Sequence, residues 1–297
     1  MKNHLREILA ASLAAADPEE AVRRLVRVEG NTVLVGDERF EAERVFVLAA
    51  GKAAGAMARA AEELFGERIA GGLIVTRYGH EAASEKLEII FAGHPEPDEK
   101  SVEAARSAEE LARSLVEGDL LLALISGGAS ALLADPAPPI ELADLKKLTG
   151  ALLRSGANIS EINTVRKHVS VLKGGGLVKL AAPAPTLALL LSDVVGDDPS
   201  AIASGLTAPD PTTLEETQRV FRRYGIEPPR SVVEHLRDAE ETPKPGDALF
   251  EKVASVVCGS GRHAAEAATE KARELGYEPI LLSTSVTGDA RGIASVY

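Results

Sequence analysis

Residues 120–132 read LLLALISGGASAL, an apolar run that passes into Ser126-Gly127-Gly128-Ala129-Ser130 and then returns to apolar residues. A continuous apolar run of this length is typical of a strand buried on both faces of a parallel sheet. The glycines allow a tight turn into a helix, and the serine hydroxyls can donate hydrogen bonds to carboxylate or phosphate oxygens. A purely structural turn is the alternative, but such turns seldom need two hydroxyls and two glycines together.

Apolar runs and helical patterns alternate on both sides of this stretch. The runs at 44–51, 71–77, 86–93 and 185–193 have the length of strands, and the amphipathic patterns at 52–66 and 98–118 have the length of helices. Buried strands separated by helices indicate a parallel sheet that is covered on both faces. We therefore predict a doubly wound α/β fold.

The other segments predict more helices and one antiparallel region. Residues 3–28 have helical spacing, and residues 27–43 read as hairpins with turns near Gly30-Asn31 and Gly36-Asp37. Further helices are predicted at 140–156, once or twice within 160–181, at 213–224 and at 230–239.

A proline-rich, charged stretch at 239–253 predicts a domain boundary. Residues 253–285 then have the pattern of a new strand–helix–strand unit, and 286–297 begin another helix. We divide the chain into a first domain, 1–240, and a segment 241–297 that holds a linker and the first βαβ unit of a second, smaller α/β domain. So short a second unit would have difficulty burying a core, and we expect the sequence to be part of a longer protein.

Charge and composition restrict the partners. The 297 residues carry a net charge of −12, which repels nucleic acid and anionic membranes and requires a local basic pocket for any anionic substrate. The single cysteine, Cys258, leaves no partner for an intramolecular disulfide. The pattern of the first residues is not that of a signal peptide, and we predict a cytoplasmic protein. One glutamine, no tryptophan and many charges suggest heat adaptation.

Functional residues are expected in the loops that follow the strands, because ligands bind beyond the carboxyl ends of the strands in an open parallel sheet. One such loop is 50–55, where Gly51 and Lys52 precede a predicted helix. A lysine at the positive end of a helix is disfavoured unless an anion joins it. A solvated lysine is the alternative interpretation.

A basic cluster follows in NTVRKHVSVLKGGG (163–176). At helical spacing Asn163, Arg166 and Lys167 share a face, and Lys173, about one and a half turns further on, converges with them only if the helix breaks at Gly174. A solvated charged face is the usual meaning of such a run, but the triple glycine favours function. We interpret His168 as structural.

Asp193 ends the apolar run 185–193, where a carboxylate can bind Mg²⁺ beside a phosphate or act on a substrate hydroxyl. Asp198-Pro199 reads instead as a helix start.

A last loop, Gly259-Ser260-Gly261, lies between a predicted strand and a predicted helix, as in a dinucleotide fingerprint. The acidic residue that would bind the ribose is missing after the next apolar run, which favours contact with a nucleotide or phosphate over NAD. No G-x-x-x-x-G-K-[ST] motif is present.

Six ordered motifs resemble the class II glycerate kinases, which are glycerate 2-kinases also named hydroxypyruvate reductases. The motifs are AAGKAAGAMA (49–58), AGHPEPDE (92–99), LISGGASALL (124–133), INTVRKHVSVLKGGGL (162–177), SDVVGDDPSAIASG (192–205) and PDPTT (209–213). The resemblance implies a Rossmann-like, three-layer N-terminal domain and a smaller C-terminal domain, most of which this sequence would lack. It also implies an active site between them that phosphorylates D-glycerate to 2-phosphoglycerate with ATP and Mg²⁺.

The resemblance also implies roles for residues of this sequence. Lys52 would stabilise charge on the transferring phosphoryl group, and Asp193 would hold Mg²⁺ or orient the attacking hydroxyl. The residues expected to bind substrate are Ser126, Gly127, Gly128, Ala129, Ser130, Asn163, Arg166 and Lys173. Gly259, Ser260 and Gly261 are the candidates for nucleotide binding.

Two other functions stay open from the sequence. One is an NAD(P)H-dependent reductase of hydroxypyruvate, for which the imperfect G-x-G-x-x-A at 259–264 is the support. The other is a non-catalytic module that binds small anions or nucleotides. A homodimer is the one oligomeric assembly that we leave open from the sequence.

Overall fold

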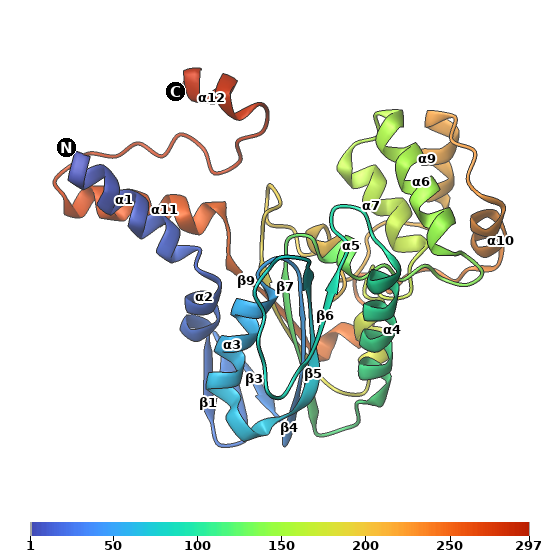
Figure 1. Ribbon diagram of the computed structural model, residues 1–297, viewed down its shortest axis with the longest axis horizontal. Coiled ribbons are helices and arrows are strands. Elements are labelled where there is room, and N and C mark those ends of the chain that lie inside the picture. Colours follow the sequence, from blue (N-terminus) through green and yellow to red (C-terminus); the bar gives the residue numbers. More distant parts are fainter. Residues whose placement is uncertain (1, 297) are drawn as a thin grey trace.

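Six parallel strands form the central sheet of the computed structural model, which describes residues 2–296 (Figure 1). Their order is β6-β5-β4-β7-β8-β9, and every neighbouring pair is parallel. The strands are β4 (Arg44–Ala50), β5 (Ile69–Arg77), β6 (Glu88–Ala92), β7 (Asp119–Ser126), β8 (Thr186–Leu191) and β9 (Val253–Gly259). All eight residues of β7 are buried, as the apolar run predicted.

Helices cover both faces of this sheet, so that the molecule has three layers. Helices α2 (Pro18–Leu25) and α3 (Ala54–Phe65) pack on one face in a core that includes Leu122 and Leu124. Helices α4 (Glu99–Ser114), α5 (Ala129–Leu132) and α8 (Gly176–Ala181) pack on the other face with Leu121 and Ala123. Alternate residues of β7 thus point to opposite faces. The predicted three-layer, doubly wound α/β fold is confirmed.

The strand order defines a switch point between β4 and β7. From β4 the chain adds β5 and β6 on one side, and from β7 it adds β8 and β9 on the other. Loops that leave two such neighbouring strands toward opposite sides open a crevice at the carboxyl end of the sheet. The loops that follow β4 and β7 are 51–53 and 127–128, which both contain residues singled out from the sequence.

Four helices form a separate unit, here called the helical subdomain: α6 (Leu142–Ser155), α7 (Ile159–His168), α9 (Leu214–Tyr224) and α10 (Arg230–Asp238). They have a core of their own, which includes Leu148, Val165, Val220 and Val232. Figure 1 shows them beside the carboxyl end of the sheet and away from its faces. The sequence predicted these helices but not their grouping, because amphipathic spacing shows that a face is buried and not what covers it.

The amino-terminal region consists of α1 (Lys2–Ala15), α2 and a three-stranded antiparallel sheet. The strands of this sheet are β1 (Val26–Glu29), β2 (Thr32–Val35) and β3 (Glu38–Glu41). The predicted hairpin turns are confirmed, with Gly30 at φ +59° and Gly36 at φ +58°. The helical prediction over residues 3–28 ran three residues too far, because Val26 already pairs with Val35.

Beyond residue 252 the structure differs from the predicted βαβ unit of a second domain. Strand β9 pairs with β8 in the first sheet, and α11 (Gly261–Glu274) packs on α1. Residues 278–283 form no strand, and α12 (Ala290–Val296) follows. A strand needs a paired neighbour, and Leu282 is 66% exposed with no strand beside it. The division at residue 240 stays a prediction, with β9 counted in the first sheet.

Short 3₁₀ turns complete the elements: η1 (Gly66–Arg68), η2 (Ile202–Ser204) and η3 (Ala248–Lys252). None of the helices found within residues 2–296 combines the length and the apolar character that a bilayer crossing requires.

Candidate functional site

The loops after β4 and β7 are joined at the switch point. The backbone N–H of Lys52 donates to the carbonyl of Gly127 (2.9 Å), and the backbone N–H of Ala53 donates to Ser126 Oγ (3.0 Å). A side chain at Gly51 would place its Cβ 2.2 Å from Ser126 Oγ, so only glycine fits there. The Ser126 hydroxyl is buried and joins the two loops, although the sequence assigned it to substrate binding. These contacts therefore place the Cα atom of Lys52 at the crevice between β4 and β7.

Two glycines let other groups approach the loop after β7. A Cβ on Gly127 would lie 2.1 Å from Asp193 Oδ2. A Cβ on Gly128, which has φ +97°, would lie 3.0 Å from His94 Cδ2 and 3.6 Å from Lys52 Cε. Lys52, His94 and Asp193 thus gather around this loop from three different strand ends.

Gly127→Ala tests whether the close contact between Asp193 and the backbone of Gly127 is important. The substitution causes no backbone strain, because the φ of Gly127 lies outside the left-handed region. We expect the variant to fold with a thermal midpoint close to that of the wild type, since the exposed Asp193 side chain can rotate away. We expect its activity in the assay described below to fall about tenfold, because a small displacement of a reacting group is costly. Unchanged activity would show that the position of Asp193 does not matter.

A cavity of about 310 Å³ opens beside this loop. Its volume is at the small end of the range for ligand pockets, which suits a metabolite of a few heavy atoms. The polar residues that line it are His94, Ser130, Asp135, Thr149, Arg166, Ser170 and Lys173, together with the backbone of Gly128.

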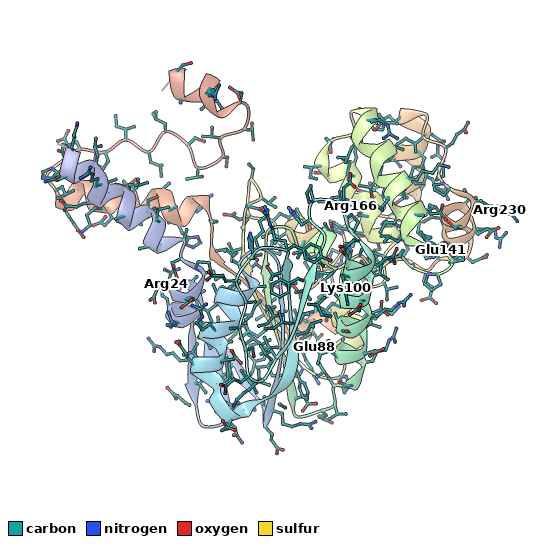
Figure 2. All side chains as sticks on the ribbon, viewed as in Figure 1. Arg24, Glu88, Lys100, Glu141, Arg166 and Arg230 are labelled. Atoms are coloured by element: carbon teal, nitrogen blue, oxygen red, sulfur yellow. The ribbon has the colours of Figure 1, made fainter. Side chains whose placement is uncertain are left out.

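Arg166 is the cation that faces this cavity from the helical subdomain (Figure 2). Its guanidinium is partly buried, and among residues 2–296 no carboxylate pairs with it; burial is the cause that lowers the pKa of Arg166. The group still stays charged at any physiological pH. A desolvated cation without a protein partner favours an anion in the cavity.

Lys173 lies at the cavity wall but is already paired. Its ammonium group contacts the Asp135 carboxylate and donates to the carbonyl of Leu133 (2.8 Å), and its side chain is 5% exposed. The Ser170 hydroxyl also donates to Asp135. Lys173 lines the cavity, and its predicted role in substrate binding stays a prediction; its ion pair with Asp135, 38 residues earlier, was not expected from the sequence.

Asp135 and Lys173 lie in two of the four segments that connect the sheet with the helical subdomain, those between α5 and α6 and between α7 and α8. These segments run side by side, with Val171 N–H donating to the Asp135 carbonyl (3.1 Å) and Ala137 N–H donating to the Val169 carbonyl (3.0 Å). We call residues 134–137 and 169–173 the neck. The Asp135–Lys173 ion pair joins the two segments of the neck, and both residues line the cavity.

Ser130 and Asn163 support the cavity through a shared partner. The Ser130 and Ser204 hydroxyls are hydrogen-bonded (3.0 Å), and Ser204 Oγ donates to Asn163 Oδ1 (3.2 Å). Ser204 has φ +58°, a conformation that is unusual for a residue with a side chain. These hydrogen bonds hold it beside the loop that carries the fully buried Ala129.

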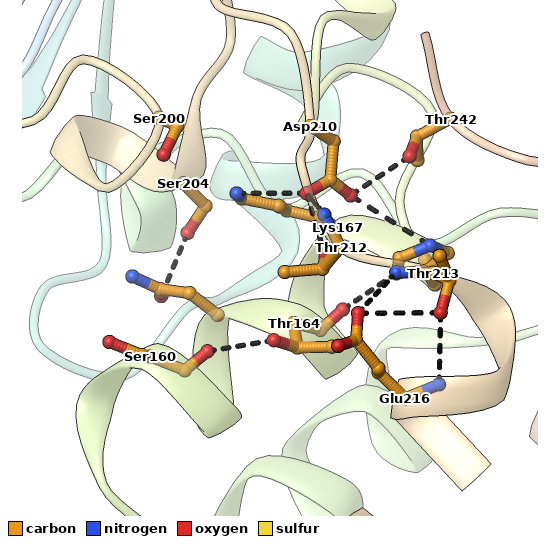
Figure 3. A network of polar contacts seen from close by, with 12 residues as sticks. Ser160, Thr164, Lys167, Ser200, Ser204, Asp210, Thr212, Thr213, Glu216 and Thr242 are labelled. Atoms are coloured by element: carbon orange, nitrogen blue, oxygen red, sulfur yellow. Dashed lines mark hydrogen bonds and ion pairs between the residues drawn. The ribbon is translucent and has the colours of Figure 1, made fainter. Parts of the chain in front are cut away.

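The two other basic residues of the run, Lys167 and His168, are not among the residues that line the cavity, and Figure 3 shows Lys167 in a separate polar network. Lys167 Nζ donates to the fully buried Asp210 (3.1 Å), which also accepts from the hydroxyls of Thr212 (2.7 Å) and Thr242 (2.8 Å). Burial acts to raise the pKa of Asp210, but these contacts together lower it. His168 Nδ1 contacts the carbonyl of Thr164 (2.8 Å), in agreement with the structural interpretation of that residue.

A smaller hollow of about 170 Å³ lies on the other side of Asp193, between the end of β8 and the start of α11. Gly261 and Arg262 line it together with residues 192–197 and 284–286. Ser260 caps α11, because its hydroxyl accepts from the backbone N–H of Arg262 (3.2 Å). Gly259 is packed against Leu191, where a Cβ would lie 2.6 Å from Cδ1. The loop predicted to bind nucleotide therefore neighbours Asp193.

His94 stands in the motif AGHPEPDE (92–99), and its role was not predicted from the sequence. The ring follows β6, and burial and then the charges of Lys52 and Arg77 lower its pKa. The signal that could have found it is positional, because Arg77 and His94 each stand at the end of a predicted strand.

No group of three or more His, Cys, Asp or Glu side chains able to hold a metal ion occurs in the part of the chain that the structure describes. Mg²⁺ is commonly held by only one or two carboxylates plus substrate phosphates. The exposed carboxylate of Asp193, next to the Gly127 backbone, fits that mode.

Residues 4–237 match the model of the family described as "Domain of unknown function (DUF4147)". The chain belongs to this family. DUF4147 therefore covers the whole central sheet except β9, together with the helical subdomain up to the last residue but one of α10. The family resemblance predicted from the sequence is confirmed.

Relatives of this DUF4147 chain have two kinds of name. It is 42% identical to "Putative hydroxypyruvate reductase" of Agrobacterium vitis, over 98% of this chain and 64% of that protein. It is 40% identical to "Glycerate 2-kinase" of Pyrococcus horikoshii, over 96% of this chain and 65% of that protein.

A solved structure agrees with the DUF4147 fold described above. The crystal structure of glycerate kinase from Thermotoga maritima is similar with a TM-score of 0.83 and 38% identity, over 95% of this chain and 64% of that one. The chain thus spans just under two thirds of the length of the relatives that it matches.

Proposed function

We propose that this chain takes part in the ATP-dependent phosphorylation of D-glycerate to 2-phosphoglycerate. The observation that carries the proposal is the guanidinium of Arg166, which has no carboxylate partner among residues 2–296 and faces a small cavity beside the loop after β7, the loop that Lys52 and Asp193 approach. The names of the relatives in Pyrococcus and Thermotoga support the same reaction.

Each group has a part in the proposed reaction. Arg166 binds the carboxylate of glycerate with two parallel hydrogen bonds, and the backbone at Gly128 leaves room for the small acid. The C2 hydroxyl oxygen forms a bond to the γ-phosphorus of ATP, while the bond from that phosphorus to the bridging oxygen of ADP breaks. The hydroxyl proton is released to solvent. Such transfers depend mainly on positioning and on stabilisation of charge, which Lys52 supplies to the phosphoryl oxygens.

In this proposal the nucleotide and the metal bind near Asp193, on the side of the smaller hollow. The loop 259–261 and the hollow next to it accept the phosphate end of ATP in this proposal. Asp193 orients the attacking hydroxyl and is the residue that would hold Mg²⁺. When bound, Mg²⁺ neutralises charge on the phosphate oxygens.

The test supplies the protein with ATP, Mg²⁺ and D-glycerate and measures ADP and 2-phosphoglycerate. Product formation supports the proposal, and its absence would reject it. A parallel assay with NADH and hydroxypyruvate tests the reductase named among the relatives. We favour the kinase because the apolar run that follows the loop 259–261 does not end in the acidic residue that binds the ribose in a dinucleotide site. A cytoplasmic location, heat adaptation and a homodimer stay predictions.

Arg166→Gln is expected to lower kcat/KM for D-glycerate about 10- to 10²-fold, mainly through KM, because it removes a charged hydrogen bond to the carboxylate. The matched control is Arg230→Gln in the same subdomain, where the side chain is 92% exposed and pairs within its own helix. We expect no change in that variant. Equal KM values for the two variants would remove Arg166 from the substrate site.

A further inference from the structure

His94 presents the two edges of its ring to different surroundings. The edge with Cδ2 and Nε2 lies against Gly128, where a Cβ would be 3.0 Å from Cδ2 and 3.1 Å from Nε2. This edge is near Lys52 and the cavity that His94 lines. The remaining nitrogen, Nδ1, is buried and has no hydrogen-bond partner among residues 2–296.

The surroundings of the ring determine its charge. Burial lowers the pKa of His94, and the charges of Lys52, Arg77 and His80 act in the same direction, against the opposing effect of Asp193. A lowered pKa means that the ring loses its proton below the usual value near 6.5. The imidazole is therefore neutral at pH 7 and carries one proton.

The buried Nδ1 determines where that proton lies. A proton on Nδ1 would create an N–H donor without an acceptor, and such orphaned donors are rarer in proteins than acceptors that lack a donor. A proton on Nε2 avoids this and leaves only the lone pair of Nδ1 buried. Of the two neutral tautomers, the Nε2–H form thus has the lower free energy.

We propose that His94 binds the substrate as a neutral hydrogen-bond donor, with its Nε2–H directed to an oxygen of the hydroxy acid held by Arg166. This inference rests on the proposed function and adds a residue to it. Because Nε2 already carries a proton, His94 is not the base that accepts the proton of the substrate hydroxyl. The ring instead fixes the orientation of the acid between Arg166 and the loop after β7.

The first experiment reads the tautomer directly. Protein labelled with ¹⁵N-histidine is examined by long-range ¹H–¹⁵N correlation NMR, and His94 is assigned by the signal lost in His94→Gln. We expect the Nε2–H pattern at pH 7, a titration midpoint below 6.5, and a shift of the Nε2 signals when D-glycerate is added. An Nδ1–H pattern, a charged ring at pH 7 or no response to D-glycerate would each overturn the inference.

The second experiment separates a donor from a base. Glutamine can place an N–H donor near the position of Nε2, so His94→Gln is expected to stay within about tenfold of wild-type kcat/KM, whereas His94→Ala loses about 10²-fold. His4→Gln, on the distant α1, is the matched control and is expected to be unchanged. If glutamine is as damaging as alanine, the donor role is wrong. If the wild type forms no product, the proposed function fails, and the NMR result still decides the inference.

Discussion

Lys52→Ala is expected to lower kcat about 10²- to 10³-fold, the cost of losing one preorganised group that stabilises charge in the transition state. The loop should keep its shape, because the contact to Gly127 is made by the backbone N–H of residue 52 and not by its side chain. KM for D-glycerate should change little if the ammonium group acts on the phosphoryl group. The measurement is steady-state kinetics with ADP release as the readout.

The matched control for that variant is Lys146→Ala, since Lys146 is an exposed lysine on α6. Its turnover should equal that of the wild type. Thermal midpoints of all three proteins should agree, which would separate chemistry from folding. Undiminished turnover in Lys52→Ala would contradict the role given to the loop after β4.

Lys173→Met is expected to lower the free energy of unfolding by about 3–5 kcal/mol, because it leaves the carboxylate of Asp135 buried without its cation. Asp135 is 1% exposed in its side chain and also accepts hydrogen bonds from Ser170 and from the backbone of Leu172. Chemical denaturation followed by circular dichroism would measure the loss. Activity should fall with it, since the pair lies in the neck.

Two companion variants make this stability prediction sharper. Lys179→Met removes an ion pair to Glu240 in which the lysine is 58% exposed, and it should change stability by no more than about 0.5 kcal/mol. The double variant Lys173→Met/Asp135→Leu removes both buried charges and should recover part of the loss. Equal losses in Lys173→Met and Lys179→Met would mean that burial does not govern the pair.

Much of the fold could be predicted because the decisive signals are local. The fully buried strand β7 has six consecutive apolar residues between Asp119 and Ser126, and Gly66 and Gly156 end helices where their sequence patterns end. The pairing of β9 with β8 could not be predicted, because an apolar run does not indicate which strand it will pair with. The helical subdomain was missed for the same reason, because its helices are joined by contacts between distant residues such as Val165 and Val232.

The site was partly accessible from the sequence. Lys52, Gly127, Gly128 and Asp193 follow strands, and the order of the strands brings such residues to one edge. The ion pair of Lys173 could not be predicted, because its partner, Asp135, is distant in sequence and the pairing arises only when the neck forms.

The neck connects the two parts of the molecule whose residues line the cavity. Arg166 belongs to the helical subdomain, whereas Lys52, Gly128 and Asp193 belong to the sheet, so a bound acid would touch two separately packed bodies at once. Backbone hydrogen bonds join residues 134–137 to residues 169–173 where the two bodies meet. The placement of the arginine over the sheet therefore depends in part on the buried ion pair between Asp135 and Lys173, which lies in this connection and in the wall of the cavity.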